Sequence, residues 1–129
     1  MKILIVEDDT PVALMMVFLL ARAGCETEVA TTGKKAMHMA QAGGFDLITL
    51  DVDLPDINGF ELIQHLKQIP HLEETPVVFV SAGATIENQQ RALDLGAADF
   101  IEKPFGASDF VSRILTHTRP SKAESSYVS

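Results

Sequence analysis

The chain alternates short apolar runs with longer segments of helical periodicity five times, and no other feature constrains its fold as strongly. Strands are expected at Ile3–Val6, Glu26–Thr31, Asp46–Leu50, Val77–Val80 and Asp99–Ile101. In the third, a short apolar run without Gly or Pro ends abruptly in acidic and turn residues. Such a run favours a parallel strand that is buried on both faces of its sheet.

The segments between these strands carry helix signals. Thr10 is expected to cap a first helix, with Pro11 at its first position and its end near Gly24. Further helices are expected from Gly33 to Gly43, from Leu62 to Ile69, over Glu87–Leu95 and around Phe110–Leu115. Five strands joined by right-handed helical crossovers predict one domain, a doubly wound five-stranded parallel sheet with helices on both faces. The Glu87–Leu95 helix has few apolar anchors and is a candidate for movement.

Charge and cysteine content exclude several classes of protein. The net charge of −8 argues against direct binding to nucleic acid or to an anionic membrane, because both need a basic face. The apolar run Val12–Ala21 falls well short of the ~20 residues that span a bilayer. The single cysteine, Cys25, cannot form an internal disulfide and fits a reducing compartment, so a cytoplasmic protein is expected.

Polar side chains follow four of the five expected strands. They are Glu7, Asp8 and Asp9 after the first strand, Asp51 after the third, Ser81 after the fourth, and Lys103 with Pro104 after the fifth. Ligands of open parallel sheets bind beyond the carboxyl ends of the strands, so these groups predict a site there. Clustered carboxylates favour a hard divalent cation, most simply Mg²⁺. Together with Lys103 and the Ser81 hydroxyl they indicate phosphoryl transfer to Asp51.

Taken singly, several of these residues have ordinary structural interpretations. Asp8 and Asp9 could cap the first helix, where carboxylates suit the positive end of the helix dipole. Lys103 could be a surface lysine, and Phe100 could be a core residue. Asp56 and Asn58 are interpreted as turn residues rather than ligands, because both types stabilise turns through their own backbone.

Four segments together resemble the receiver domain of two-component response regulators, of the stand-alone, chemotaxis-receiver-like kind, over residues 1–117. They are Val-Glu-Asp-Asp at 6–9, Leu-Asp-Val-Asp-Leu-Pro at 50–55 with Asn-Gly at 58–59, Val-Ser-Ala at 80–82 and Lys-Pro-Phe at 103–105. The resemblance implies a flavodoxin-like (βα)5 fold. It also implies a phosphorelay domain that takes its phosphoryl group from a sensor histidine kinase or a histidine phosphotransfer protein.

The same resemblance implies a role for each motif residue. Asp51 would be the phosphoacceptor, and Asp8, Asp51 and the backbone carbonyl of Asp53 would bind Mg²⁺ with Glu7 assisting. Lys103, Ser81 and the backbone of Ala82 would bind the phosphoryl group, Ser81 and Phe100 would form the switch, and the Lys103–Pro104 peptide would be cis. The domain would catalyse its own phosphorylation and autodephosphorylation rather than turn over free substrates. It would act as a monomer or weak dimer on a downstream protein target.

Two departures from the commoner family pattern are visible. Ser81 stands where many members have threonine, which keeps the hydroxyl. Asp53 and Gly83 occupy positions that often tune hydrolysis, so the lifetime of the phosphorylated form is left open.

Two other functions also stay open. Asp51-Val52-Asp53 resembles the nucleophile pair of haloacid-dehalogenase-like phosphatases, although Pro55 interrupts that motif. Alternatively, a receiver-like module could bind a partner without being phosphorylated.

The first helix is apolar on every side over Val12–Ala21, whereas a helix packed on one side of a sheet normally has a polar stripe. Val12, Met15 and Leu19 are therefore expected either to form a docking patch for the phosphodonor or to be covered by the last helix and the tail. Residues 118–129 lack hydrophobic periodicity and are expected to be a disordered tail or the start of a linker.

Overall fold

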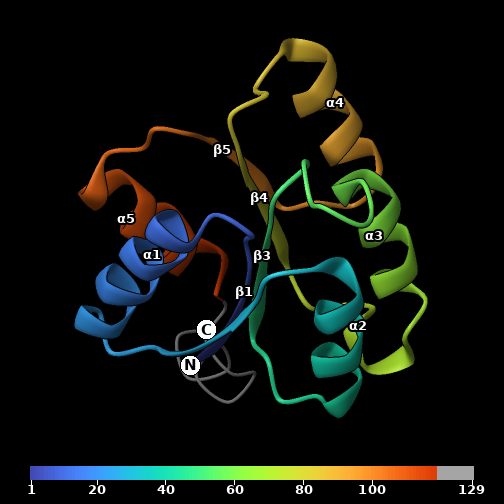
Figure 1. The fold of residues 1–129 in the computed structure, drawn as a ribbon, viewed down its shortest axis with the longest axis horizontal. Coiled ribbons are helices and arrows are strands. Elements are labelled where there is room, and N and C mark those ends of the chain that lie inside the picture. The colour runs from blue at the N-terminus through green and yellow to red at the C-terminus, as the bar shows by residue number, and fades with distance from the viewer. Residues whose placement is uncertain (119–129) are drawn as a thin grey trace, which may run out of the picture.

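The computed structural model describes residues 1–118, and the tail predicted from the sequence falls almost wholly outside the described residues. Five parallel strands form one sheet in the order β2-β1-β3-β4-β5 (Figure 1). The elements are β1 (Lys2–Val6), α1 (Thr10–Arg22), β2 (Glu26–Ala30), α2 (Gly33–Ala42), β3 (Leu47–Leu50), α3 (Gly59–Lys67), η1 (Pro70–Leu72), β4 (Val77–Ser81), α4 (Ile86–Asp94), β5 (Asp99–Glu102) and α5 (Ala107–His117). The predicted doubly wound α/β fold is confirmed.

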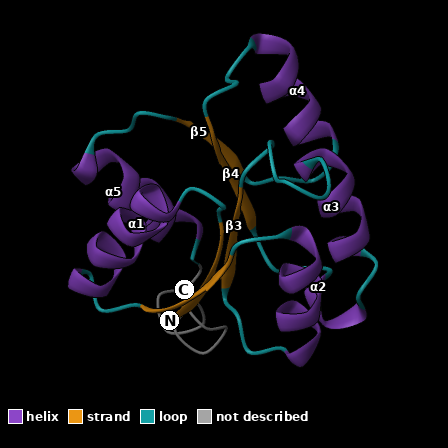
Figure 2. Cartoon of the chain, in the orientation of Figure 1, coloured by secondary structure: helices purple, strands orange, loops and turns teal. Residues whose placement is uncertain are grey.

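Helices cover both faces of the sheet and enclose two apolar clusters. Figure 2 shows α1 and α5 on one side of the strands and α2, α3 and α4 on the other. Phe79 lies in the cluster beneath α2, α3 and α4, whereas Phe110 lies in the cluster beneath α1 and α5. Strand β1 pairs with both β2 and β3, so the chain order reverses at this point of the sheet. Ligand sites of doubly wound folds form at such reversals.

Element boundaries differ from the sequence predictions by at most three residues. Asp9, rather than Thr10, caps α1, because its carboxylate accepts a hydrogen bond from the Val12 N–H at 3.3 Å. Strand β2 ends at Ala30, which leaves Thr32 free to cap α2. Helix α3 ends at Lys67 instead of reaching Pro70, which begins the short helix η1. The predicted type and order of the five strands and five α-helices are nevertheless correct, whereas η1 was not predicted.

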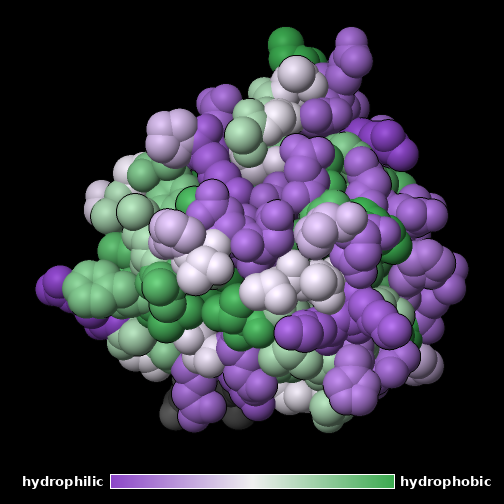
Figure 3. Space-filling model, viewed as in Figure 1, coloured by the Kyte–Doolittle hydropathy of each residue, from purple (hydrophilic) through white to green (hydrophobic). Residues whose placement is uncertain are grey.

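Helix α1 is only partly covered by the described residues. Met16 and Leu20 are buried, and Val12 and Leu19 pack partly against the same cluster. Met15 is 53% exposed, and Leu14 and Phe18 are exposed beside it. Figure 3 shows apolar surface on the side of the molecule where α1 and α5 lie. No helix in residues 1–118 is long and apolar enough to cross a membrane.

Asp99 joins the start of β5 to the end of α5. Its carboxylate accepts hydrogen bonds from Arg113 Nε at 3.1 Å and from the Phe100 N–H at 2.8 Å, and it lies 3.0 Å from His117 Nε2. Burial acts to raise the pKa of Asp99, but the hydrogen bonds outweigh it and hold the pKa below its usual range. A carboxylate with a lowered pKa stabilises the fold above its unfolded pKa, and this contribution disappears as the pH falls through the folded pKa.

Asp99→Asn is therefore expected to lower the free energy of unfolding by about 1–2 kcal/mol at pH 7, because a partly buried charged hydrogen-bond network is lost. The difference from the wild type should shrink as the pH falls below about 4. Urea unfolding at a series of pH values measures both quantities. Asp109→Asn is the control, since Asp109 is more exposed and lies 3.6 Å from the same arginine. Equal losses in the two variants would contradict the proposed role of Asp99.

Candidate functional site

Three carboxylates meet at the carboxyl edge of the sheet. Strands β1 and β3 are parallel neighbours with Val6 opposite Leu50, so Glu7 and Asp51 leave the sheet side by side. Glu7, Asp8 and Asp51 each place one oxygen within 4.8 Å of the other two. Glu7 is 1% exposed and Asp51 is 6% exposed, whereas Asp8 is exposed. Two buried carboxylates at this separation need nearby positive charge.

Lys103 supplies the positive charge that the structure shows in this cluster. Its Nζ lies 2.8 Å from Asp51 Oδ2 and 2.5 Å from Glu7 Oε1. Burial raises the pKa of Glu7. Burial would lower the pKa of Lys103, but hydrogen bonds to Asp51 and Glu7 outweigh it and raise that pKa instead. One ammonium group therefore faces three carboxylates, and the arrangement suits an additional cation with oxygen ligands.

Backbone groups hold the acids and the lysine in place. Asp51 Oδ1 accepts a hydrogen bond from the Asp53 N–H at 3.1 Å, and Glu7 Oε2 accepts one from the Asp9 N–H at 3.1 Å. The Lys103 N–H donates to the carbonyl of Ser81 at 3.0 Å, and the Lys103–Pro104 peptide bond is cis. Each of these site residues thus lies at the end of a strand or in a loop that is hydrogen-bonded to a strand end.

Ser81 and Phe100, on the neighbouring strands β4 and β5, are both buried. The Ser81 hydroxyl is fully buried at the end of β4 and has no hydrogen-bond partner within the described residues. Phe100 is 7% exposed, and its ring stacks on Phe79 with 5.9 Å between the centroids. The ring that the resemblance assigns to the switch therefore lies inside the core in this structure. A buried hydroxyl without a partner is costly, and a ligand oxygen at the site would satisfy it.

Sequence reasoning missed two features of the loop between β3 and α3. Asn58 agrees with its interpretation as a turn residue, because its Oδ1 accepts a hydrogen bond from the nearby Phe60 N–H at 2.8 Å and caps α3. Asp56 was also interpreted as a turn residue, but its carboxylate accepts a hydrogen bond from the Gly33 N–H at the start of α2. The turn interpretation does not predict this contact. Gly59 packs so closely on the Asp51 carbonyl that a Cβ atom would overlap it. The Asn-Gly pair marks the turn in the sequence, but only the fold shows what the glycine touches.

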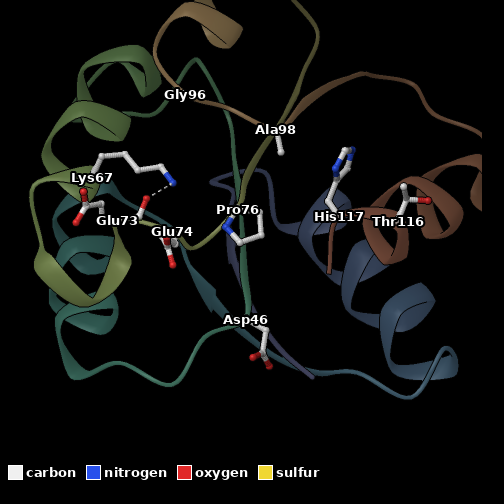
Figure 4. A pocket seen from close by; sticks show the side chains of 9 residues that line it. All are labelled: Asp46, Lys67, Glu73, Glu74, Pro76, Gly96, Ala98, Thr116 and His117. Carbon is white, nitrogen blue, oxygen red and sulfur yellow. Dashed lines mark hydrogen bonds between the residues drawn. The ribbon is translucent and has the colours of Figure 1, made fainter. Parts of the chain in front are cut away.

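Two of the surface cavities bear on function. A groove of about 350 Å³ opens beside the carboxylate cluster and is lined by Val12, Met15, Ala82, Lys103, Pro104 and Phe105. A cavity of about 590 Å³ lies near the amino ends of β3 and β4, and Figure 4 shows Lys67 and the acidic side chains of Asp46, Glu73 and Glu74 around it. The second cavity shares no residue with the carboxylate cluster.

The combination of a doubly wound sheet with acids and a lysine at its switch point defines a signalling domain of the two-component class. The family model described as response regulator receiver domain matches residues 3–115. This chain belongs to that family.

Individual relatives agree with the assignment. The transcriptional regulatory protein CusR of Escherichia coli is 35% identical over 119 residues, which cover 92% of this chain and 52% of CusR. DltR of Streptococcus agalactiae is 34% identical over 94% of this chain and 53% of DltR. The chain therefore spans about half the length of the curated relatives it matches.

Solved structures show the same fold along the whole domain. A putative response regulator from Chloroflexus aurantiacus has a TM-score of 0.86 and 31% identity, covering 91% of this chain and 96% of that one. The non-phosphorylated HemR receiver domain from Leptospira biflexa has a TM-score of 0.85 and 33% identity, covering 93% and 98%. The chemotaxis protein CheY4 of Vibrio cholerae has a TM-score of 0.85 and 29% identity, covering 89% and 96%.

Proposed function

We propose that Asp51 is the phosphoacceptor of a phosphorelay. An Asp51 carboxylate oxygen attacks the phosphorus of a phosphohistidine, a P–O bond forms, the P–N bond breaks, and the released imidazole nitrogen takes up a proton. The observation that carries this proposal is the bridge from Lys103 to Asp51 and Glu7, next to the exposed carboxylate of Asp8. The bridge places an ammonium group where negative charge accumulates during transfer. Later attack by water would release phosphate and restore the carboxylate.

The residues present fit a magnesium ion. Glu7, Asp8 and Asp51 offer the oxygen ligands that Mg²⁺ prefers, and Lys103 balances only part of their charge. In this proposal Asp8, Asp51 and the backbone carbonyl of Asp53 hold the ion, with Glu7 assisting. When bound, the ion would neutralise charge on the phosphoryl oxygens. The protein residues do the remaining work, since Asp51 attacks while Lys103 orients the group.

Ser81 and Phe100 would couple phosphorylation to a protein-interaction surface. The unpartnered Ser81 hydroxyl and the Ala82 N–H would donate hydrogen bonds to the phosphoryl oxygens beside Lys103. Movement of Ser81 at the end of β4 would reach Phe100 through Phe79 of the same strand, whose ring stacks on that of Phe100. The response would then reach the face of α4, β5 and α5, where Ile86 and Leu93 are exposed. A downstream protein target would bind there, and phosphorylation would shift an existing equilibrium between two conformations of this face.

We place phosphoryl transfer to this domain in the cytoplasm, consistent with the single unpaired cysteine.

Intact-mass spectrometry of the wild-type chain with a small phosphodonor tests the function directly. We expect one added phosphate per chain in the presence of Mg²⁺ and none after chelation. Continuous release of phosphate from a simple ester, without a labelled chain, would favour the phosphatase alternative. If no label forms, beryllofluoride binding in the presence of Mg²⁺ separates a receiver that needs its own kinase from a module that only binds partners.

The groove beside Lys103 is our candidate for docking the phosphodonor. Val12 and Met15 of α1 line it together with Phe105, so an apolar helix seated there would lie next to Asp51. Leu19, which the sequence placed in the same patch, lies further along α1 in a separate cavity against Val111 of α5. The docking patch is therefore better described by Val12 and Met15 than by all three residues.

Met15→Asp is expected to slow transfer from a phosphorylated histidine partner by about tenfold, because a carboxylate replaces an exposed apolar contact at an interface. Labelling by a small phosphodonor should not change, since Met15 is absent from the carboxylate cluster. Rapid-quench measurements with both donors give the two rates. Leu93→Asp on α4 is the control, because Leu93 is equally exposed but distant from the groove. Unchanged transfer in Met15→Asp would contradict docking at this groove.

A further inference from the structure

The loop between β3 and α3 is attached to a second element far away in the sequence. Asp56 Oδ1 accepts a hydrogen bond from the Gly33 N–H at 2.8 Å, and its Oδ2 accepts one from the Lys34 N–H at 3.0 Å. Both donors lie in the first turn of α2, so a carboxylate from one loop closes the end of another helix. In Figure 1 this loop lies above the start of α2. These hydrogen bonds lower the pKa of Asp56, so the group is a carboxylate at neutral pH.

The apolar neighbour of Asp56 strengthens the same attachment. A Cβ atom at Gly33 would overlap Ile57 Cγ2, so the isoleucine side chain lies directly on the helix backbone. The glycine does not have a positive φ, so its backbone could hold another residue. The absence of a side chain at Gly33 is therefore explained by the closeness of Ile57. The tip of the loop is held by two charged hydrogen bonds and one close apolar contact.

This attachment is not the local cap of α2. Thr32 performs that task, because its Oγ1 accepts from the Lys35 N–H at 3.1 Å and its carbonyl accepts from the Ala36 N–H. Asp56 satisfies the two remaining N–H groups of the first turn. The local cap and the long-range attachment can therefore be removed separately by mutation.

The other end of the loop carries the acceptor and a proposed metal ligand. Asp53 forms an isolated antiparallel bridge with Asn58, and the Gly59 N–H donates to the carbonyl of Val52 at 2.7 Å. The Asp53 N–H also donates to Asp51 Oδ1. The loop is thus closed at its base, and a displacement of its tip would be transmitted to Asp53.

We propose that Asp56 is a positioning residue for the metal site: by fixing the loop tip to the start of α2, it holds the Asp53 carbonyl in the direction that a bound cation requires. The proposal rests on the function proposed above, in which Mg²⁺ binds beside Asp51. Residues that support metal ligands from outside the coordination shell typically change metal affinity by about 10–100-fold when mutated. Asp56 lies at the far end of the loop, so we expect the lower end of this range.

The test compares Asp56→Ala with Thr32→Ala in the full chain. Both variants remove a cap from the same helix turn, but only the first releases the loop. Isothermal titration calorimetry with Mg²⁺ measures affinity, urea unfolding without Mg²⁺ measures stability, and labelling by a small phosphodonor is followed across Mg²⁺ concentrations. We expect Asp56→Ala to weaken Mg²⁺ binding about tenfold while labelling at saturating Mg²⁺ stays within about threefold of the wild type. Thr32→Ala should lose stability but retain its Mg²⁺ affinity.

Two further variants separate positioning from general destabilisation. Asp56→Asn keeps one acceptor oxygen and should recover part of the affinity. Gly33→Ala keeps both hydrogen-bonding N–H groups but displaces Ile57, and it should weaken Mg²⁺ binding although alanine favours a helix more than glycine does. The inference is overturned if Asp56→Ala binds Mg²⁺ as the wild type does, or if Thr32→Ala loses as much affinity. A wild-type chain that neither binds Mg²⁺ nor becomes labelled would instead overturn the proposed function, and this inference with it.

Discussion

Asp51→Asn is expected to abolish phosphorylation by a small phosphodonor while the fold stays intact. An asparagine has nearly the same shape and keeps an oxygen that can accept the Asp53 N–H, which donates to Asp51 Oδ1. It lacks the negative charge that makes the side chain a nucleophile, and its amide nitrogen cannot accept from Lys103, which now lies 2.8 Å from Oδ2. We therefore expect no added phosphate, weaker Mg²⁺ binding and little change in circular dichroism.

Intact-mass spectrometry of both proteins, run side by side, measures the effect. Asp53→Asn is the matched control, because its carboxylate is exposed, lies two residues away and is not part of the oxygen cluster. It should still become labelled, since the proposed role of Asp53 in the metal site depends on its backbone carbonyl, while its side chain bears only on how long the label lasts. A phosphate on Asp51→Asn, located by peptide mapping on another side chain, would show that the acceptor has been misassigned.

Lys103→Met should have the second largest effect. Removal of one preorganised donor from a developing oxyanion typically costs about 100-fold or more in rate, and Lys103 is the ammonium group that contacts Asp51. Mg²⁺ affinity should rise or stay constant, because Glu7, Asp8 and Asp51 lose a competing cation. A slower reaction together with undiminished metal binding distinguishes a role in transfer from a role in holding the ion.

Stability should also respond to the loss of Lys103. Glu7 and Asp51 would be left buried without their partner, which we expect to cost about 2–3 kcal/mol at pH 7 after allowance for partial exposure of the lysine. Added Mg²⁺ should restore part of this loss by binding the folded state. Lys67→Met is the control, since Lys67 is also half-buried but donates to the Thr75 carbonyl at 2.6 Å. If Lys103→Met became labelled at the wild-type rate, Lys103 would have no part in the reaction.

The sequence predicted the fold because the relevant signals are local. A strand is marked by a run of a few apolar residues, and its end is marked by the acids and turn residues that follow it. The cap of α1 shows where local signals become ambiguous, since Asp9 and Thr10 can both cap a helix. The Asp9 N–H donates to Glu7 Oε2, so the choice depends on the orientation of a buried side chain. Such an orientation is set by packing rather than by residue type.

For a similar reason, the sequence did not predict which side of helix α1 faces solvent. Val12, Met15 and Leu19 were predicted to share one surface because the helix is apolar on every side. Packing on the sheet and against α5 directs Leu19 partly inward and leaves Leu14 and Phe18 exposed. A uniformly apolar helix has no polar stripe to indicate which side faces solvent. Its rotation is therefore determined by what it packs against.

The sequence by itself determined the order of the elements, the parallel sheet and the group of strand ends that carry Glu7, Asp51, Ser81 and Lys103. These follow from hydrophobic period and turn chemistry, which act over a few residues. Only the tertiary structure decided that Lys103 bridges Glu7 and Asp51, that the Ser81 hydroxyl lacks a partner, and that Asp56 binds the start of α2. The hydrogen-bonded partners in these pairs lie at least 22 residues apart in the sequence, so their geometry depends on how whole elements pack.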